Sequence, residues 1–144
     1  MSAGWVAGSV RARLLLEHRA GVQAALRVAQ AGSLAEALTG LAGTVYAPLP
    51  AGASLEEAQR AIAVCTAPRI RVLAAWLPPG GAVGLRSLAA WFELVNIEDR
   101  LAYLAGAELR APFELGVLAS VWDSVASAQS GEAIRTLLAS SSWG

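Results

Sequence analysis

Apolar residues recur at three- and four-residue steps along most of this chain, which is the spacing of one face of an α-helix. Between residues 4 and 31 the face consists of Val6, Val10, Leu14, Val22, Leu26 and Ala29. No segment shows a competing alternation of apolar and polar residues, which a half-buried strand would require. The 144 residues suit one hydrophobic core. We therefore predict a single all-α domain over residues 1–144.

Capping and helix-breaking residues divide this pattern into about six helices. Ser33 with Glu36, and Ser54 with Glu57, have the spacing of a capping box and predict two helix starts. Pro68 predicts a kink or break near Ala67. The expected helices span residues 4–31, 33–43, 54–77, 83–105, 112–125 and a short segment after residue 130, with "PPGG" (78–81) ending the third. Their unequal lengths and the kink predict an irregular bundle.

The composition is unusually apolar for a free-standing soluble domain. Hydrophobic residues make up 56% of the chain and charged residues 15%, and the mean hydropathy is +0.50. The longest charge-free stretch, residues 37–55, contains two prolines and three glycines, so it cannot form one helix across a bilayer. This favours a protein that buries extra surface against partners, and it predicts self-association of the isolated chain.

Charge and N-terminal pattern exclude some other classes. The formal net charge is zero, and all eleven basic residues are arginine. No basic stripe interleaved with aromatic residues is present, which argues against nucleic-acid binding. The N-terminus does not resemble a signal peptide. A single cysteine cannot form an internal disulfide and is typical of a reducing compartment.

The sequence offers little material for catalysis. His18 is the only histidine and lies beside charged residues, so we expect it at the surface. Cys65 lies on an apolar helix face, where a buried and inert thiol is expected. Two such residues are too few for a zinc site, and the chain has no glycine-rich phosphate loop. The acidic pairs 56–57 and 98–99 have the character of helix-surface charge. We therefore predict a non-enzymatic protein without metal or cofactor.

The five tryptophans divide into two groups. Three fall on apolar faces at helical spacing, which favours core packing over a ligand cage: Trp76, Trp91 and Trp122. Trp5 and Trp143 lie near the ends and need something to pack on, which could be another domain or subunit. Together with Arg11 and Tyr46, these two are the candidate partner interface.

An asparagine stands in the middle of the apolar helix predicted around "WFELVNIEDRLAYLAG" (91–106). Glu93, Asn96 and Arg100 lie at i, i+3 and i+7 and therefore near one stripe of that helix. This polar stripe could hydrogen-bond a neighbouring helix or loop and fix its register. Asn96 could instead face solvent or contact a partner directly.

Residues 33–47 and 130–144 are similar to each other without gaps. "SLAEALTGLAGTVYA" and "SGEAIRTLLASSSWG" match at an offset of 97 residues, pairing Ser33 with Ser130 and Thr39 with Thr136. Tyr46 meets Trp143, another aromatic residue. The match suggests a repeat of about a hundred residues, with this chain as one unit of a longer architecture.

The ordered set of motifs resembles the C/d-type coupling subunit of the V-type and A-type rotary ATPases. The resemblance rests on "WVAGSVRARLL", "GSLAEALTGLAGTVYA", "ELVNIEDRLAYLAG" and "GVLASVWDSVASAQS". It covers nearly the whole chain but only the first third to half of a full family member. Two positions depart from the family pattern: Glu93 replaces the usual aspartate, and Ser9 replaces a frequent arginine.

This resemblance implies a fold and a role. Family members are similar to a funnel of three related helical units that sits on the membrane rotor ring and receives the central stalk. The chain would be the N-terminal unit of such a non-catalytic coupling subunit, cytoplasmic and peripheral at the membrane through its protein partners, and acting in ion transport. One alternative is a helical scaffold or adaptor that kept the fold without the motor role. Another is a regulatory domain with an apolar ligand cavity.

Overall fold

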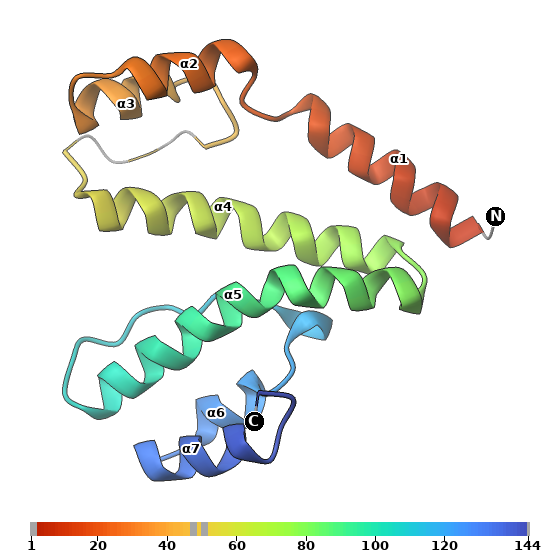
Figure 1. Ribbon diagram of the computed structural model, residues 1–144, viewed down its shortest axis with the longest axis vertical. Helices are drawn as coiled ribbons and strands as arrows, with labels where there is room; N and C mark the ends of the chain where they lie inside the picture. The colour runs from red at the N-terminus through yellow and green to blue at the C-terminus, as the bar shows by residue number, and fades with distance from the viewer. Residues whose placement is uncertain (1–2, 47–48, 50–51, 144) are drawn as a thin grey trace.

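A computed structural model describes residues 3–46, 49 and 52–143 (Figure 1). The described residues are helical, with no strand among them, and the expected all-α fold class is confirmed. The elements are α1 (Ala3–Glu17), α2 (Val22–Gln30), α3 (Leu34–Gly40), α4 (Leu55–Trp76), α5 (Pro79–Leu104), the 3-10 helix η1 (Gly116–Leu118), α6 (Trp122–Ser127) and α7 (Gly131–Ala139).

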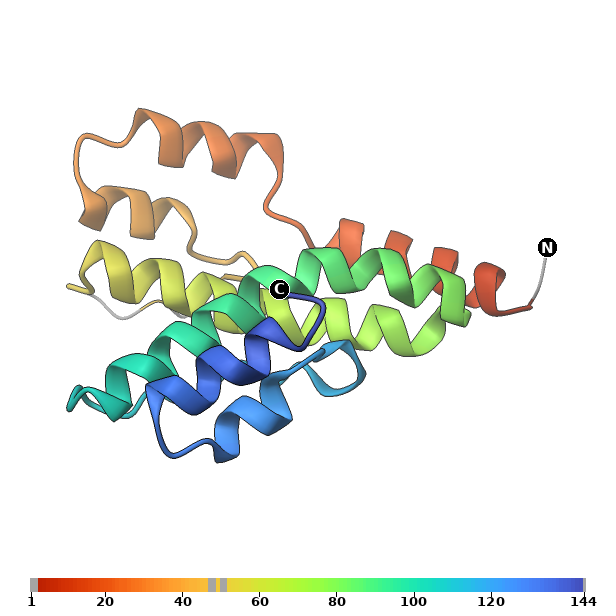
Figure 2. The ribbon, with the colours of Figure 1, turned by 60° about the horizontal axis from the view of Figure 1, so that its bottom comes forward.

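The hydrophobic core lies in the C-terminal two-thirds of the chain, around the α4–α5 pair. One cluster joins α4 and α5 to the segment around η1, with Phe92, Phe113, Leu115 and Leu118 at its centre. A second cluster joins α5 to α6 and α7 around Ile97, Val121, Val125 and Ile134. Helix α5 contributes to both clusters, and Figure 2 shows α6 and α7 beside it. This helix is therefore the central element of the fold.

Helices α1 to α3 form an N-terminal arm with little core of its own. Helix α1 packs on α4, while α2 and α3 pack on each other at the far end of the arm (Figure 1). The buried residues of these three helices are only Gly8, Ala24 and Gly40. Gly8 lies against Leu77 of the body and Gly40 lies against α2, while most large apolar side chains of the arm are exposed.

The predicted helix caps at Ser33 and Ser54 are present, and Ser130 caps α7. Ser54 Oγ accepts a hydrogen bond from the Glu57 N–H at 3.2 Å, and the Glu57 carboxylate accepts from the Ser54 N–H at 2.7 Å, which completes a capping box. Ser33 Oγ accepts from the Glu36 N–H, but the Glu36 carboxylate accepts from the N–H of Gly32. The second box is therefore displaced by one residue, and both helices are capped.

The two similar segments have the same local structure. Their serines cap α3 and α7 with nearly the same backbone angles, φ −150°, ψ 160° and φ −149°, ψ 154°. Three side-chain hydrogen bonds also recur at equivalent positions. The hydroxyls of Thr39 and Thr136 each donate to the carbonyl four residues earlier, and those of Thr44 and Ser141 to the carbonyl three residues earlier. The same Thr44 and Ser141 hydroxyls accept from the N–H groups of Tyr46 and Trp143. The sequence match thus reflects a repeated helix-and-turn unit.

Several predicted helix boundaries were wrong. The first helix is interrupted over residues 18–21, where Gly21 becomes the N-cap of α2. Helix α4 continues through Pro68 without the predicted break, and because Pro68 is exposed, water can reach the Val64 carbonyl that the proline leaves without a donor. Helix α5 begins at Pro79, since proline fits the first helical position. The "PPGG" segment therefore starts one helix as well as ending another.

The helix predicted from Pro112 through Val125 is absent, and α6 begins only at Trp122. The residues between α5 and α6 are non-helical except for η1 and the turn that ends α5. Side chains of α5 and α4 bind the backbone of this segment and so replace the hydrogen bonds that a helix would have made. We call residues 107–130 the return segment, because it leaves the end of α5 and passes back along that helix.

The burial of three residues was also predicted wrongly. Trp91 is 70% exposed and Trp76 is 52% exposed, whereas Trp122 packs against the second cluster as expected. Cys65 is only partly buried. Each lies at the margin of a packed helix face, where periodicity alone does not decide which side of the margin a residue occupies.

Candidate functional site

The Glu93 carboxylate of α5 is a buried hydrogen-bond acceptor for the start of α6. It is 1% exposed. It accepts from the N–H groups of Ser120, Val121 and Trp122 at 2.7, 2.8 and 2.9 Å, and from Ser120 Oγ at 2.6 Å. The side chain of Val121, the N-cap of α6, accepts no bond from that helix, so Glu93 supplies the missing acceptor from a different helix.

The environment of Glu93 also determines its charge. Burial raises the pKa of this carboxyl, because it disfavours the anion, but the hydrogen bonds from Ser120, Val121 and Trp122 outweigh burial and leave the pKa below its ordinary value. Glu93 is therefore an anion at neutral pH. Its carboxylate accepts hydrogen bonds from the N–H groups at the start of α6, where the helix dipole also favours a negative charge.

The Asn96 side chain pairs with the backbone of Phe113 in the return segment. Asn96 is 0% exposed. Its Oδ1 accepts from the Phe113 N–H at 2.7 Å, and its Nδ2 donates to the Phe113 carbonyl at 2.9 Å. The asparagine thus satisfies both polar groups of one backbone residue inside the core. Burial excludes the alternative that Asn96 faces solvent.

Arg100 binds the far end of the return segment. Its Nη2 donates to the Ala128 carbonyl at 2.6 Å, and the guanidinium lies over the Tyr103 ring at 5.3 Å. Its Nε is buried without a hydrogen-bond partner among the described residues. Together, Glu93, Asn96 and Arg100 hold the return segment at residues 120–122, 113 and 128. The polar stripe thus anchors the return segment to α5 through hydrogen bonds.

A second set of charges, which no sequence pattern indicated, joins α4 to the same region. Arg60 of α4 donates to Asp99 Oδ2 at 2.8 Å and to the Ala111 carbonyl at 2.7 Å, and its guanidinium lies 5.0 Å from the centre of the Phe113 ring. Arg110 pairs with Glu56 at 2.6 Å. These partners are 39 or more residues apart, so no short-range spacing could have revealed them.

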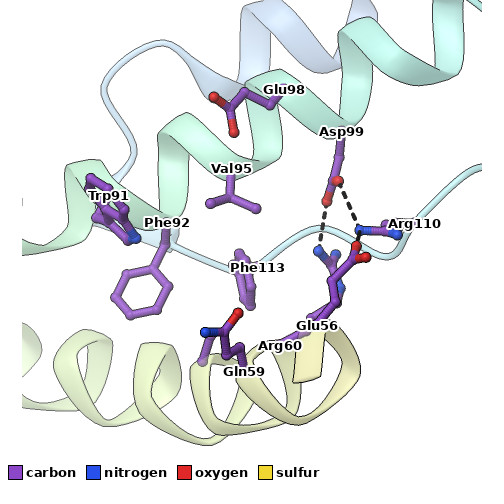
Figure 3. Close-up of a pocket in the computed structure, with 11 residues that line it drawn as sticks. Glu56, Gln59, Arg60, Trp91, Phe92, Val95, Glu98, Asp99, Arg110 and Phe113 are labelled. Atoms are coloured by element: carbon purple, nitrogen blue, oxygen red, sulfur yellow. Dashed lines mark hydrogen bonds and ion pairs between the residues drawn. The ribbon is translucent and has the colours of Figure 1, made fainter. Parts of the chain in front are cut away.

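A pocket of about 440 Å³ opens between α4, α5 and the return segment (Figure 3). Phe92 and Phe113 stack edge to face at its base with their centroids 5.4 Å apart, and the exposed Trp91 forms one side. The guanidinium groups of Arg60 and Arg110 are both paired with carboxylates. Glu98 also lines the pocket and forms no ion pair with any other described residue.

The four candidate interface residues contact different parts of the molecule. Trp5 lies near Gly81 at the start of α5 and is 46% exposed. Arg11 is partly buried on α1, and its Nε has no partner among the described residues. Tyr46 lies under the guanidinium of Arg69, 5.8 Å from it. Trp143 packs on the second cluster, and its Nε1 donates to Ser120 Oγ at 2.9 Å.

Trp143 therefore finds its packing partner within the chain itself. Ser120 donates to Glu93 and accepts from Trp143, so the end of the chain is joined through one hydroxyl to the polar stripe of α5. Of the two terminal tryptophans, Trp5 is the more exposed.

The described residues hold no group of three His, Cys, Asp or Glu side chains that could bind a metal ion. His18 is exposed, and its Nδ1 donates to the Leu14 carbonyl at 2.8 Å. Over the same residues, no helix has both the length and the apolar content to cross a bilayer. Comparison of the chain with protein families, with curated proteins and with solved structures gave no match.

Proposed function

We propose that this chain is a non-catalytic coupling unit of a V-type or A-type rotary ATPase, which joins the central stalk to the membrane rotor ring. The family assignment rests on the ordered motifs that resemble the C/d-type coupling subunit. The mechanical role is supported by the hydrogen bonds with which Glu93, Asn96 and Arg100 anchor the return segment to α5. These bonds turn residues 107–130, which are mostly non-helical, into part of one firmly packed body.

A coupling role of this kind requires a rigid structure and no catalytic residues. A subunit that transmits torque must move as one piece, because a segment that yields would absorb the rotation. In the body of this chain, the buried side chains of Glu93 and Asn96 are hydrogen-bonded to residues 17 to 29 positions away, and such networks favour a single packed arrangement. The ATP chemistry and the ion pathway would belong to other subunits, which places this chain at the membrane only through its partners.

The exposed apolar side chains of the N-terminal arm support a docking role. Seven large apolar residues of α1 and α2 are more than 40% exposed: Trp5, Val6, Val10, Leu14, Leu16, Val22 and Leu26. An exposed apolar surface of this kind marks a site of protein interaction. We propose that α2, at the far end of the arm, contacts a stalk or ring subunit.

Co-purification of the tagged full chain from its own cells, at low salt in mild detergent, tests the proposal. We expect rotor-ring and central-stalk subunits in the eluate. The variant Val22→Ser/Leu26→Ser should lose them, because it removes two apolar side chains that are 70% and 46% exposed. The matched control Val117→Ser alters an apolar residue of η1 that is 66% exposed and should retain them.

Two outcomes would contradict the motor assignment. Recovery of a reproducible set of partners without ATPase subunits would indicate the alternative, a helical scaffold or adaptor. Recovery of no partner by the wild-type chain, under conditions that keep the ATPase assembled, would reject the coupling role itself.

A further inference from the structure

The charges of the chain are unevenly distributed between the arm and the body. Residues 1–46, which include the arm helices α1 to α3, carry four arginines and two glutamates, a net charge of +2. Residues 47–144 carry seven arginines and nine acidic residues, a net charge of −2. The zero net charge of the whole chain therefore conceals a basic arm and an acidic body, each of which would attract the other part of a second molecule.

The outer face of α1 presents a stripe of apolar residues that ends in a cation. Val6 is 49% exposed and Val10 is 53% exposed, while Arg13 follows one turn later and is also exposed. Arg13 forms no ion pair or side-chain hydrogen bond with any other described residue. Gly4 and Gly8 of α1 face Pro78 and Leu77, which follow the end of α4. The stripe lies on the opposite side of α1 and therefore points away from the body of its own chain.

Helix α5 presents a stripe with the same spacing that ends in an anion. Trp91 is 70% exposed, Val95 is half-buried one turn later, and the exposed Glu98 follows at the next turn. Figure 3 shows these three side chains along α5 beside the pocket. Glu98 is the one pocket carboxylate without an ion pair in the described part of the chain.

We propose that this surface receives α1 of a second copy of the chain. With the two helices parallel, Val6 meets Trp91, Val10 meets Val95 and Arg13 meets Glu98, because both stripes advance by four and then three residues. At 1.5 Å per residue, each stripe spans about 10 Å, so all three pairs form in one register. The Arg13 guanidinium would then face the Glu98 carboxylate, which attracts a cation.

The contact uses two different surfaces of the same chain. Each copy therefore offers an α1 and receives one, which gives a reciprocal dimer if two contacts close on each other and a head-to-tail chain if they do not. The inference concerns how copies of this chain bind one another and does not depend on the proposed role in a rotary ATPase.

Sedimentation velocity of the purified full chain at low salt tests the proposal by charge reversal. We expect the wild type to associate with rising concentration, and Arg13→Glu or Glu98→Arg alone to weaken association at least about tenfold, which is about 1.4 kcal/mol. The double variant, and an equimolar mixture of the two single variants, should recover association because opposite charges again face each other. Added salt should weaken the wild-type contact.

The matched control is Arg135→Glu, which reverses an exposed charge on α7 and should associate as the wild type does. Circular dichroism should show the same helix content for all variants, since both charge-reversed residues are exposed. A wild-type chain that stays monomeric at its highest soluble concentration would overturn the inference. So would association that neither single reversal weakens, or single-variant losses that the double variant does not recover.

The two proposals fail separately. A monomeric chain that still co-purifies with ATPase subunits would remove only the self-association. A self-associating chain that recovers no ATPase subunit would remove only the coupling role.

Discussion

The side-chain amide of Asn96 binds both backbone polar groups of Phe113, accepting from its N–H at 2.7 Å and donating to its carbonyl at 2.9 Å. This pair replaces backbone hydrogen bonds that a helix or strand would otherwise supply. It also fixes the position of the Phe113 ring, which packs against Phe92 and lies under Arg60. One buried amide therefore determines both the path of the return segment and the base of the pocket.

Replacing Asn96 with leucine should destabilise the protein strongly. Leucine fills a similar volume but leaves the Phe113 N–H and carbonyl buried without partners, and each such group costs about 1–3 kcal/mol. We expect the free energy of unfolding in urea to fall by about 3 kcal/mol. The control Gln30→Leu, at an exposed position of α2, should change it little. An unchanged midpoint for Asn96→Leu would show that the amide pair has no structural role.

Replacing Glu93 with glutamine should destabilise the protein in a pH-dependent way. Glutamine retains one acceptor oxygen but loses the charge that strengthens four hydrogen bonds, so we expect a loss of about 2 kcal/mol at pH 7. The pKa of Glu93 is lower in the folded chain than its ordinary value of 4.5. Its contribution is therefore complete above about pH 4.5 and is lost as the pH falls through the folded-state value.

The difference in unfolding free energy between wild type and Glu93→Gln should thus be constant near neutral pH and shrink below pH 4.5. Urea denaturation of both proteins across that range measures it. Glu98→Gln removes an exposed carboxylate from the same helix and should leave the stability near that of the wild type. A Glu93→Gln difference that grows on acidification would contradict this assignment.

Features that depend on neighbouring residues were predictable from the sequence. The serine caps predicted for α3 and α4 are present, because a cap needs only a side chain and the backbone three residues ahead. The break between α1 and α2 was missed, although Gly21 stands there, because the apolar period continues across it. Gly21 indicated a possible helix boundary, but the continuous apolar spacing from Val6 to Ala29 favoured a single helix.

Features that depend on distant residues were not predictable in the same way. The 112–125 segment has a helical pattern, but Asn96 and Glu93 compete for its backbone from 17 and 27 residues away. The sequence marked both side chains as unusual without indicating what they would bind. The ion pair between Arg60 and Asp99 could not be predicted from the sequence, because charged residues are common on exposed helix faces and neither residue stands out there.

Replacing Pro68 with alanine should stabilise α4. Proline lacks the N–H that would bond to the carbonyl of Val64 and is about 3 kcal/mol less favourable than alanine inside a helix. Because Pro68 is exposed, water can satisfy that carbonyl, and we expect a gain of about 1–2 kcal/mol. A rise in the thermal unfolding midpoint would agree. A fall would mean that the body of the protein requires the local geometry that the proline imposes on α4.

A methyl group at Gly8 should disturb the attachment of the arm to the body. A Cβ built on Gly8 would lie 2.3 Å from Leu77 Cδ2 and 3.0 Å from Leu77 Cγ, whereas one on Gly84 of α5 would meet nothing within 4 Å. Both glycines are helical, so alanine gains about 1 kcal/mol of helix propensity at either position. Only Gly8→Ala must also displace Leu77, which lies against Gly81 on its other side.

We therefore expect Gly84→Ala to be more stable than the wild type and Gly8→Ala to be less stable than Gly84→Ala by about 1–3 kcal/mol, the usual cost of overpacking. Hydrogen exchange of the α1 amides gives a local measurement. It should accelerate in Gly8→Ala and stay unchanged in Gly84→Ala, because only the first weakens the contact between α1 and α4. Equal stabilisation by both alanines, with equal protection of α1, would show that Leu77 yields freely and that close approach at Gly8 does not hold the arm in place.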